Sequence, residues 1–168
     1  IGILAAVIIP NMRTNPLYEA ATQLVSHIRY TQHLAMVDDK FDSNVSSEWY
    51  KKRWTIRFKK DVLFFGTTYS DEWAYSIFSD TSKDGNPNLS EMARNPLNID
   101  QYLSGGYNDV LDIKNTASMS KLRVGSSYGI TNVTFGGGCR SNILYVYFDN
   151  MGRPFNSMNT SSAYEIAS

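Results

Sequence analysis

The sequence predicts an α+β domain in which one long N-terminal helix packs on antiparallel β-sheets. Apolar residues recur at helical spacing over residues 17–35, and apolar and polar residues alternate in several later runs, first over 54–59. The chain has 168 residues, of which 42% are hydrophobic, so a single domain with its own core is expected. We expect a helical part at 1–39 and a β-rich head at 40–168.

The chain opens on the apolar segment Ile1–Pro10, IGILAAVIIP. As a helix, its first nine residues would be about 14 Å long, roughly half of the hydrocarbon core of a bilayer. Two interpretations stay open: a helix buried in a soluble core, or the second half of a transmembrane helix that begins upstream. In the second case, the residues that would form an assembly helix in this hydrophobic stub are Ile1, Ile3, Leu4, Val7, Ile8 and Pro10.

An amphipathic helix of about six turns follows. Asn15 is placed to cap it and Pro16 to occupy its first position, and it should end near residues 38–39. The apolar stripe expected to pack it against the head contains Leu17, Leu24 and Ile28, with Ala21 and Ala35 on the same face.

The stretch from residue 51 to 60 combines a strand pattern with many basic residues. Trp54, Ile56 and Phe58 should face the core, and the alternating residues, among them Arg53 and Thr55, should face water. Basic residues interleaved with aromatic rings would suit a groove for single-stranded nucleic acid, with the candidates Lys51, Lys52, Arg53, Arg57 and Lys59. A solvated strand face is favoured, because the rings point away from the charges.

Further runs complete the expected antiparallel sheets. They lie near residues 62, 75, 133 and 145, and the run near 133 rests on the alternation of Thr131, Val133 and Phe135. The run ILYVYF at 143–148 is continuously apolar, which is typical of a central strand covered on both faces. It closes on a tight turn within the phrase FDNMGRPF.

The longest polar stretch, residues 80–91, has an oxygen-bearing side chain at every second position in its centre. Calcium prefers such ligands, and the candidates are Asp80, Asp84, Asn86 and Asn88. The spacing does not match an EF-hand, and the same residue types dominate ordinary turns, so a solvated loop without metal is favoured. No other cofactor is expected.

No catalytic constellation is visible in the sequence. His27 and His33 are six residues apart on different faces of a helix, and no nucleophile-elbow motif accompanies a serine. Gly136–Gly138 run into Cys139 rather than the Gly-Lys-Ser/Thr ending of a phosphate-binding loop. Sixteen basic and sixteen acidic residues balance, so no overall field draws the chain to nucleic acid or an anionic membrane. We do not expect an enzyme.

Two phrases resemble those of a known family. IGILAAVIIP is similar to the end of the hydrophobic helix that begins type IV pilins and type II secretion pseudopilins. FDNMGRPF is similar to the F-D-x-x-G-R-P phrase near the end of the head in minor, GspH/FimT-like pseudopilins. The resemblance implies a pilin-like head in the periplasm, an anchor in the bacterial inner membrane, prepilin methylation and filament assembly with other pilin or pseudopilin subunits.

The first expectation from this resemblance is a minor pseudopilin of a type II secretion pseudopilus, a structural subunit that could meet secreted cargo. The alternative is a minor type IV pilin that contacts DNA through residues 51–60. The chain lacks the phenylalanine and early glutamate that begin mature members of the family, and Cys139 lacks the later partner cysteine that relatives tend to have. Truncation at both ends is therefore expected.

Overall fold

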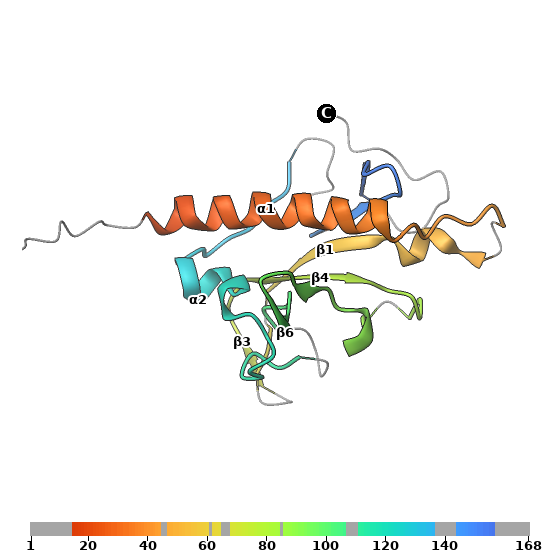
Figure 1. Cartoon of the computed structure of the whole chain (residues 1–168). Helices are drawn as coiled ribbons and strands as arrows, with labels where there is room; N and C mark the ends of the chain where they lie inside the picture. Colours follow the sequence, from red (N-terminus) through yellow and green to blue (C-terminus); the bar gives the residue numbers. More distant parts are fainter. Residues whose placement is uncertain are drawn as a thin grey trace, which may run out of the picture.

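The computed structural model describes residues 15–44, 47–60, 62–64, 68–84, 86–106, 111–136 and 144–156. One long N-terminal helix lies along a mainly antiparallel sheet, which confirms the α+β class (Figure 1). The expected assembly segment Ile1–Pro10 and the residue Cys139 lie outside the described residues.

Helix α1, Pro16–Val37, has the ends that the sequence predicts. The Asn15 side chain accepts hydrogen bonds from the backbone N–H groups of Leu17 and Tyr18, at 3.1 and 3.3 Å, and Pro16 opens the first turn. The helix ends at Asp38, whose N–H still donates to the Leu34 carbonyl. These local interactions set both ends of α1 independently of the head.

The main sheet has the strand order β4-β1-β7-β8. Its strands are β1 (Trp54–Lys59), β4 (Ala74–Ser79), β7 (Tyr145–Phe148) and β8 (Pro154–Phe155), all paired antiparallel. Ile56 of β1 pairs with Ile77 of β4 on one side and with Val146 of β7 on the other. The two inner strands are therefore β1 and β7, so the inner position predicted for the apolar run at 143–148 holds for its described part, β7.

Two smaller sheets and several short helices surround this sheet. Strands β2 (Val62–Phe64) and β3 (Thr68–Ser70) form one hairpin, and β5 (Arg94–Asn95) and β6 (Asn98–Tyr102) form another. The short helices are η2 (Trp49–Lys52), η3 (Leu89–Glu91), η4 (Ser120–Leu122) and α2 (Val124–Tyr128). The strands predicted near residues 54, 62, 75 and 145 are confirmed.

The strand predicted near residue 133 is wrong. Residues 130–136, which follow the Gly129 cap of α2, form a segment without ladder pairing, although Val133 and Phe135 pack against the core beneath α1. Asn132 and Thr134, which alternate with Val133 and Phe135, are exposed, and this alternation requires no neighbouring strand; Thr131, expected on the same face as Val133, is exposed as well. The alternation therefore reflects alternate side chains that contact the core, and not pairing with another strand.

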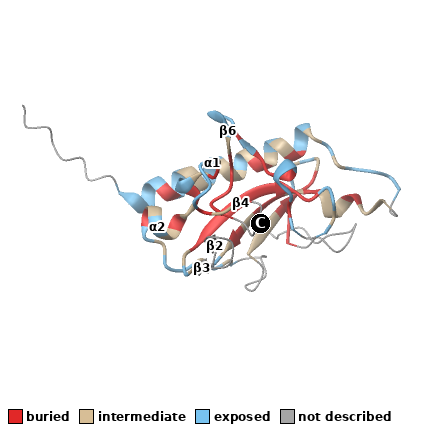
Figure 2. Cartoon of the chain, turned by 90° about the horizontal axis from the view of Figure 1, so that it is seen from below, coloured by how far each residue is buried: buried red, intermediate tan, exposed pale blue. Residues whose placement is uncertain are grey.

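Both faces of the main sheet are covered, as the buried strands in Figure 2 show. Ile56, Phe58 and Tyr75 lie in the core beneath α1. On the opposite face, Phe78 packs in a second cluster whose other buried members are Met92, Tyr102 and Leu111. Because this second layer exists, the expectation that Thr55 faces water is wrong: it is only 1% exposed.

Candidate functional site

An apolar groove of about 560 Å³ lies between α1 and the segment 130–136. Among its described lining residues, Asn132 and Thr134 have polar side chains and all the others are apolar. The lining from α1 consists of Leu17, Ala20, Ala21, Leu24 and Ile28, and the facing wall includes Val124, Ile130, Val133, Phe135 and Val146. A groove of this volume and composition is suited to bind apolar side chains.

The three residues predicted to pack α1 against the head all border this groove. Leu24 and Ile28 are partly buried and contact the core. Leu17, in the first turn of α1, is 65% exposed, so the expectation that it packs against the head is wrong. The apolar stripe of α1 therefore continues into the groove's open end instead of closing against the head.

A polar network fixes α1 to the head beside the groove. Tyr75 of β4 is fully buried, and its hydroxyl lies 2.8 Å from Nδ1 of His27 and accepts from Nε2 of Gln23 at 2.9 Å. The Tyr128 hydroxyl donates to Oε1 of Gln23 at 2.9 Å, which adds α2 to the network. Burial lowers the pKa of His27 and raises the pKa of Tyr75 above its ordinary range. Both shifts favour the neutral form of the group.

The phrase FDNMGRPF forms the turn between β7 and β8. The carboxylate of Asp149, 3% exposed, accepts from the backbone N–H groups of Met151 and Arg153 at 3.0 and 2.9 Å. It also accepts from Nε and Nη2 of Arg153, each at 2.8 Å. Gly152 has a φ of +73°, which glycine adopts without strain. The Asp, Gly and Arg of the phrase thus have separate structural roles in one turn.

This turn also contacts α1. Nε2 of Gln32 donates to the Gly152 carbonyl at 3.1 Å, and Nδ2 of Asn150 donates to the Asp39 carboxylate at 3.2 Å. The C-terminal half of α1 is therefore attached to the β7–β8 turn, and its N-terminal half to Tyr75 and Tyr128.

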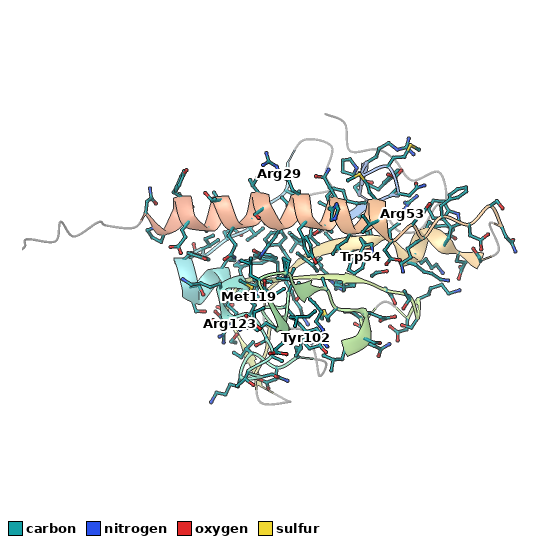
Figure 3. All side chains as sticks on the ribbon, in the orientation of Figure 1. Arg29, Arg53, Trp54, Tyr102, Met119 and Arg123 are labelled. Atoms are coloured by element: carbon teal, nitrogen blue, oxygen red, sulfur yellow. The ribbon has the colours of Figure 1, made fainter. Side chains whose placement is uncertain are left out.

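The prediction that Arg53 faces water and could contact nucleic acid is wrong. Its side chain is 3% exposed, and its guanidinium lies between the rings of Trp49 and Phe155, with centroid distances of 4.8 and 4.2 Å. Figure 3 shows Arg53 beside Trp54, where the chain enters the sheet. A guanidinium enclosed in this way cannot reach a phosphate, because the ring of Phe155 in β8, which lies far away in sequence, covers it.

The remaining basic candidates are dispersed. Lys51 forms an ion pair with Glu48 at 2.6 Å, and Lys52 lies beside it in η2. Arg57 lies 5.8 Å from the Tyr145 ring on the sheet face opposite α1, and Lys59 ends the same strand. Without Arg53, the predicted basic stripe is interrupted at its centre.

The loop at residues 80–91 is organised by Glu91, which the sequence did not single out. The Glu91 carboxylate accepts from the backbone N–H groups of Ser82 and Asn88, at 2.6 and 2.7 Å, and from the Thr81 hydroxyl at 2.7 Å. These bonds lower the pKa of Glu91 although burial opposes them. The capping-box spacing from Asn88 to Glu91 was a readable signal for this role.

The calcium candidates are distributed around this loop. Asp80 is buried, whereas Asp84, Asn86 and Asn88 are exposed, and Asp84 accepts from the Asn86 backbone at 2.8 Å. Over the described ranges, no group of three or more His, Cys, Asp or Glu side chains is placed to hold a metal ion. Calcium binding stays a prediction.

The β5–β6 hairpin carries an exposed apolar tip that the sequence analysis missed. Leu97 is 94% exposed and Ile99 is 74% exposed, and the tip projects from the body of the molecule (Figure 2). The readable signal was a pair of aliphatic residues beside an Asn-Pro turn in a polar stretch.

Comparison of the sequence with protein-family models found no match, and comparisons with curated proteins and with solved structures also found none. Of the helices within the described ranges, none combines the length and the apolar character needed to cross a membrane.

Proposed function

We propose that this protein is a pilin-like structural subunit, a minor pseudopilin of a type II secretion filament. The observation that carries the proposal is the position of α1. Five residues separate the apolar segment Ile1–Pro10 from this 22-residue helix, which lies along the main sheet of the head. A helix that follows an apolar segment in the chain and packs along a sheet suits a subunit that is anchored in a membrane before it assembles.

The attachment of α1 supports this role. Four contacts hold α1 to distant parts of the chain: Gln23 and His27 bond to Tyr75, Tyr30 to the Arg94 carbonyl and Gln32 to the Gly152 carbonyl. A force applied along α1 would therefore be transmitted to the whole head. Gly152 of the F-D-x-x-G-R-P phrase takes part in one of these attachments.

The proposed assembly step moves Ile1–Ile9 from the inner membrane into a bundle of neighbouring subunits. Lipid tails and packed apolar helices solvate aliphatic side chains almost equally well, so the transfer itself costs little free energy. The direction of assembly is then determined by helix packing and by an external motor. In this proposal the head stays in the periplasm, and the protein has a structural rather than a catalytic role.

Membrane fractionation of bacterial cells that produce the protein tests the anchor. The intact chain should sediment with the inner membrane and need detergent for release, whereas deletion of Ile1–Met12 should leave a soluble head with unchanged far-UV circular dichroism. Ile8→Leu is the matched control for Ile8→Asp, since only the aspartate introduces a charge into the apolar segment. A soluble intact chain, together with an unfolded deletion variant, would show that Ile1–Ile9 is a core helix and would refute the proposal.

Mass spectrometry of the mature protein from source-cell membranes tests its class. The expected N-terminus is a methylated phenylalanine about a dozen residues upstream of Ile1. A mature N-terminus at Ile1 would contradict pilin-type processing.

A further inference from the structure

We propose that protonation of His27 releases the N-terminal half of α1 from the head and thereby opens the apolar groove beside it. This pH-sensitive contact goes beyond the proposed function, because it depends on groups within the head and not on membrane insertion of Ile1–Ile9. It uses a chain of hydrogen bonds whose direction follows from the groups that form it.

The direction of this chain is fixed first at Gln23 of α1. Nε2 of Gln23 lies 3.0 Å from the backbone carbonyl oxygen of Lys121, which can only accept a hydrogen bond. The carboxamide is therefore oriented with Nε2 as the donor, both to this carbonyl and to the Tyr75 hydroxyl oxygen at 2.9 Å. Oε1 of Gln23 then accepts from the Tyr128 hydroxyl at 2.9 Å.

The chain ends at His27. Because the Tyr75 oxygen accepts from Gln23, the hydroxyl proton of Tyr75 is free to donate to another acceptor. Among the described residues, the acceptor within reach of it is Nδ1 of His27, at 2.8 Å. The neutral ring of His27 therefore carries its proton on Nε2. The donors run in one direction, from Tyr128 through Gln23 and Tyr75 to His27.

Protonation of His27 disrupts the last bond of this chain. A proton on Nδ1 turns the acceptor into a donor, so it meets the Tyr75 hydroxyl proton instead of receiving it. Tyr75 is 1% exposed, and a buried hydroxyl proton without an acceptor costs free energy. Burial also disfavours the charged ring, which lowers the pKa of His27. Both costs are relieved when His27 moves away from Tyr75 into water.

The elements around His27 carry few other groups that could offset this charge. The described titratable or charged residues that they direct toward this part of α1 are Tyr75 of β4, Tyr128 of α2, Lys121 of η4 and Arg94 of β5. Nζ of Lys121 lies 3.8 Å from the Glu19 carboxylate, and both side chains are about half exposed, so water screens them. The Arg94 guanidinium lies over the Tyr102 ring, 3.7 Å from its centroid. Strands β1 and β7 contribute apolar side chains to the core beneath α1, including Ile56, Phe58 and Val146.

The two halves of α1 are attached differently. The polar contacts of the N-terminal half include those of Gln23 and His27 with Tyr75. At the C-terminal half, Nε2 of Gln32 donates to the Gly152 carbonyl at 3.1 Å, and Nε1 of Trp54 donates to the Asp38 carboxylate at 3.0 Å. Neither of these two contacts includes a histidine. Protonation of His27 should therefore release one half of the helix and leave the other half attached.

The half that is released forms one wall of the groove. Its lining residues from α1 all lie between Leu17 and Ile28. Figure 1 shows α2, which contributes Val124 to the groove and Tyr128 to the hydrogen-bond chain, beneath this half of α1. Separation of α1 from Tyr75 and Tyr128 would move the two walls apart. The population of molecules with an open groove should therefore rise below pH 6.5, the ordinary pKa of histidine.

Hydrogen–deuterium exchange of the full chain between pH 5 and 8, corrected for the intrinsic effect of pH on exchange, measures the release. In wild type, the protection of amides in residues 20–28 should fall by up to about tenfold for each pH unit below 6.5, the limit for one proton. Amides in residues 29–37 should keep their protection. An equal loss in both segments would overturn the proposal, because it would show unfolding of the whole helix.

Three variants identify the group responsible. His27→Gln is neutral at every pH, so residues 20–28 should lose their acid response. His33→Gln, at an exposed position of the same helix, is the matched control and should respond like wild type. Tyr75→Phe removes the hydroxyl, so residues 20–28 should already be less protected at pH 8. A wild-type acid response in His27→Gln, or wild-type protection in Tyr75→Phe, would overturn the proposal.

NMR of the ¹⁵N-labelled histidine rings tests the direction of the chain. Neutral His27 should carry its proton on Nε2, and its protonation should coincide with the loss of protection in residues 20–28. A proton on Nδ1 of the neutral ring would show that His27 donates to Tyr75, which would overturn the proposal. These results are independent of the membrane fractionation above, so either proposal can fail while the other holds.

Discussion

At the scale of single residues, buried polar side chains organise this protein. Asp149 and Glu91 each accept several hydrogen bonds from neighbouring backbone N–H groups, and each thereby determines the course of a loop. Arg53 is different, because it is buried between two aromatic rings and its Nε and Nη1 have no hydrogen-bond partner among the described residues. Charge in the sequence is therefore a poor guide to exposure in the fold.

His27 should make the stability of the head depend on pH. Burial lowers its pKa in the folded state from the ordinary value of 6.5, so the unfolded chain binds the proton more readily. The stability present above pH 6.5 should fall as the pH decreases from 6.5 through the lower folded-state pKa. Urea unfolding of wild type and His27→Gln between pH 5 and 8 measures this difference.

The matched control is His33→Gln, because His33 is exposed on the same helix. Wild type and His33→Gln should lose stability in parallel on acidification, while His27→Gln should lose less. If the unfolding free energies of all three proteins change equally with pH, the contact between His27 and Tyr75 does not resist protonation of His27.

At the scale of elements, local sequence determined some structures fully and others only in part. Helix α1 has its cap, its first proline and its apolar stripe within one continuous stretch, so its bounds were predictable. The β7–β8 turn was predictable for the same reason, since Asp149, Gly152 and Arg153 interact within five residues. The segment 130–136 alternates like a strand but has no neighbour to pair with among the described strands.

The β7–β8 turn should depend strongly on the charge of Asp149. Asp149→Asn keeps the side-chain size but weakens the bonds to Arg153, and we expect a loss of about 2–3 kcal/mol in unfolding free energy. Asp100→Asn, at an exposed site of β6, should change stability by less than about 0.5 kcal/mol. Chemical denaturation measures both, and similar values for the two variants would contradict the assigned role of the Asp149 turn.

At the scale of the whole molecule, one sheet is shared by two cores. Strands β1 and β4 pack against α1 on one face and contribute Phe78 to the second cluster on the other. Figure 1 shows α1 lying along one side of β1 and β4. Both layers should therefore unfold together, because they cover opposite faces of the same sheet and the loss of either layer would expose one of those faces.

Leu111→Ala tests this cooperativity from the face remote from α1. Leu111 is almost fully buried, so the truncation should cost about 2–5 kcal/mol. Near-UV and far-UV circular dichroism should still report one coincident transition at a lower temperature. A far-UV transition from α1 that persists after the near-UV signal is lost would show that the two layers unfold separately.

The sequence by itself determined the α+β class, the bounds of α1, most strands of the main sheet and the turn at 149–153, because the interactions that specify them join residues close in the chain. It also placed Leu24 and Ile28 against the head, whereas Leu17, expected there too, is exposed. Only the tertiary structure decided that Arg53 and Thr55 are buried, that residues 130–136 form a wall rather than a strand, and that this wall and α1 border an apolar groove. These features depend on segments far apart in sequence that cover both faces of one sheet, and no local pattern encodes which face is covered.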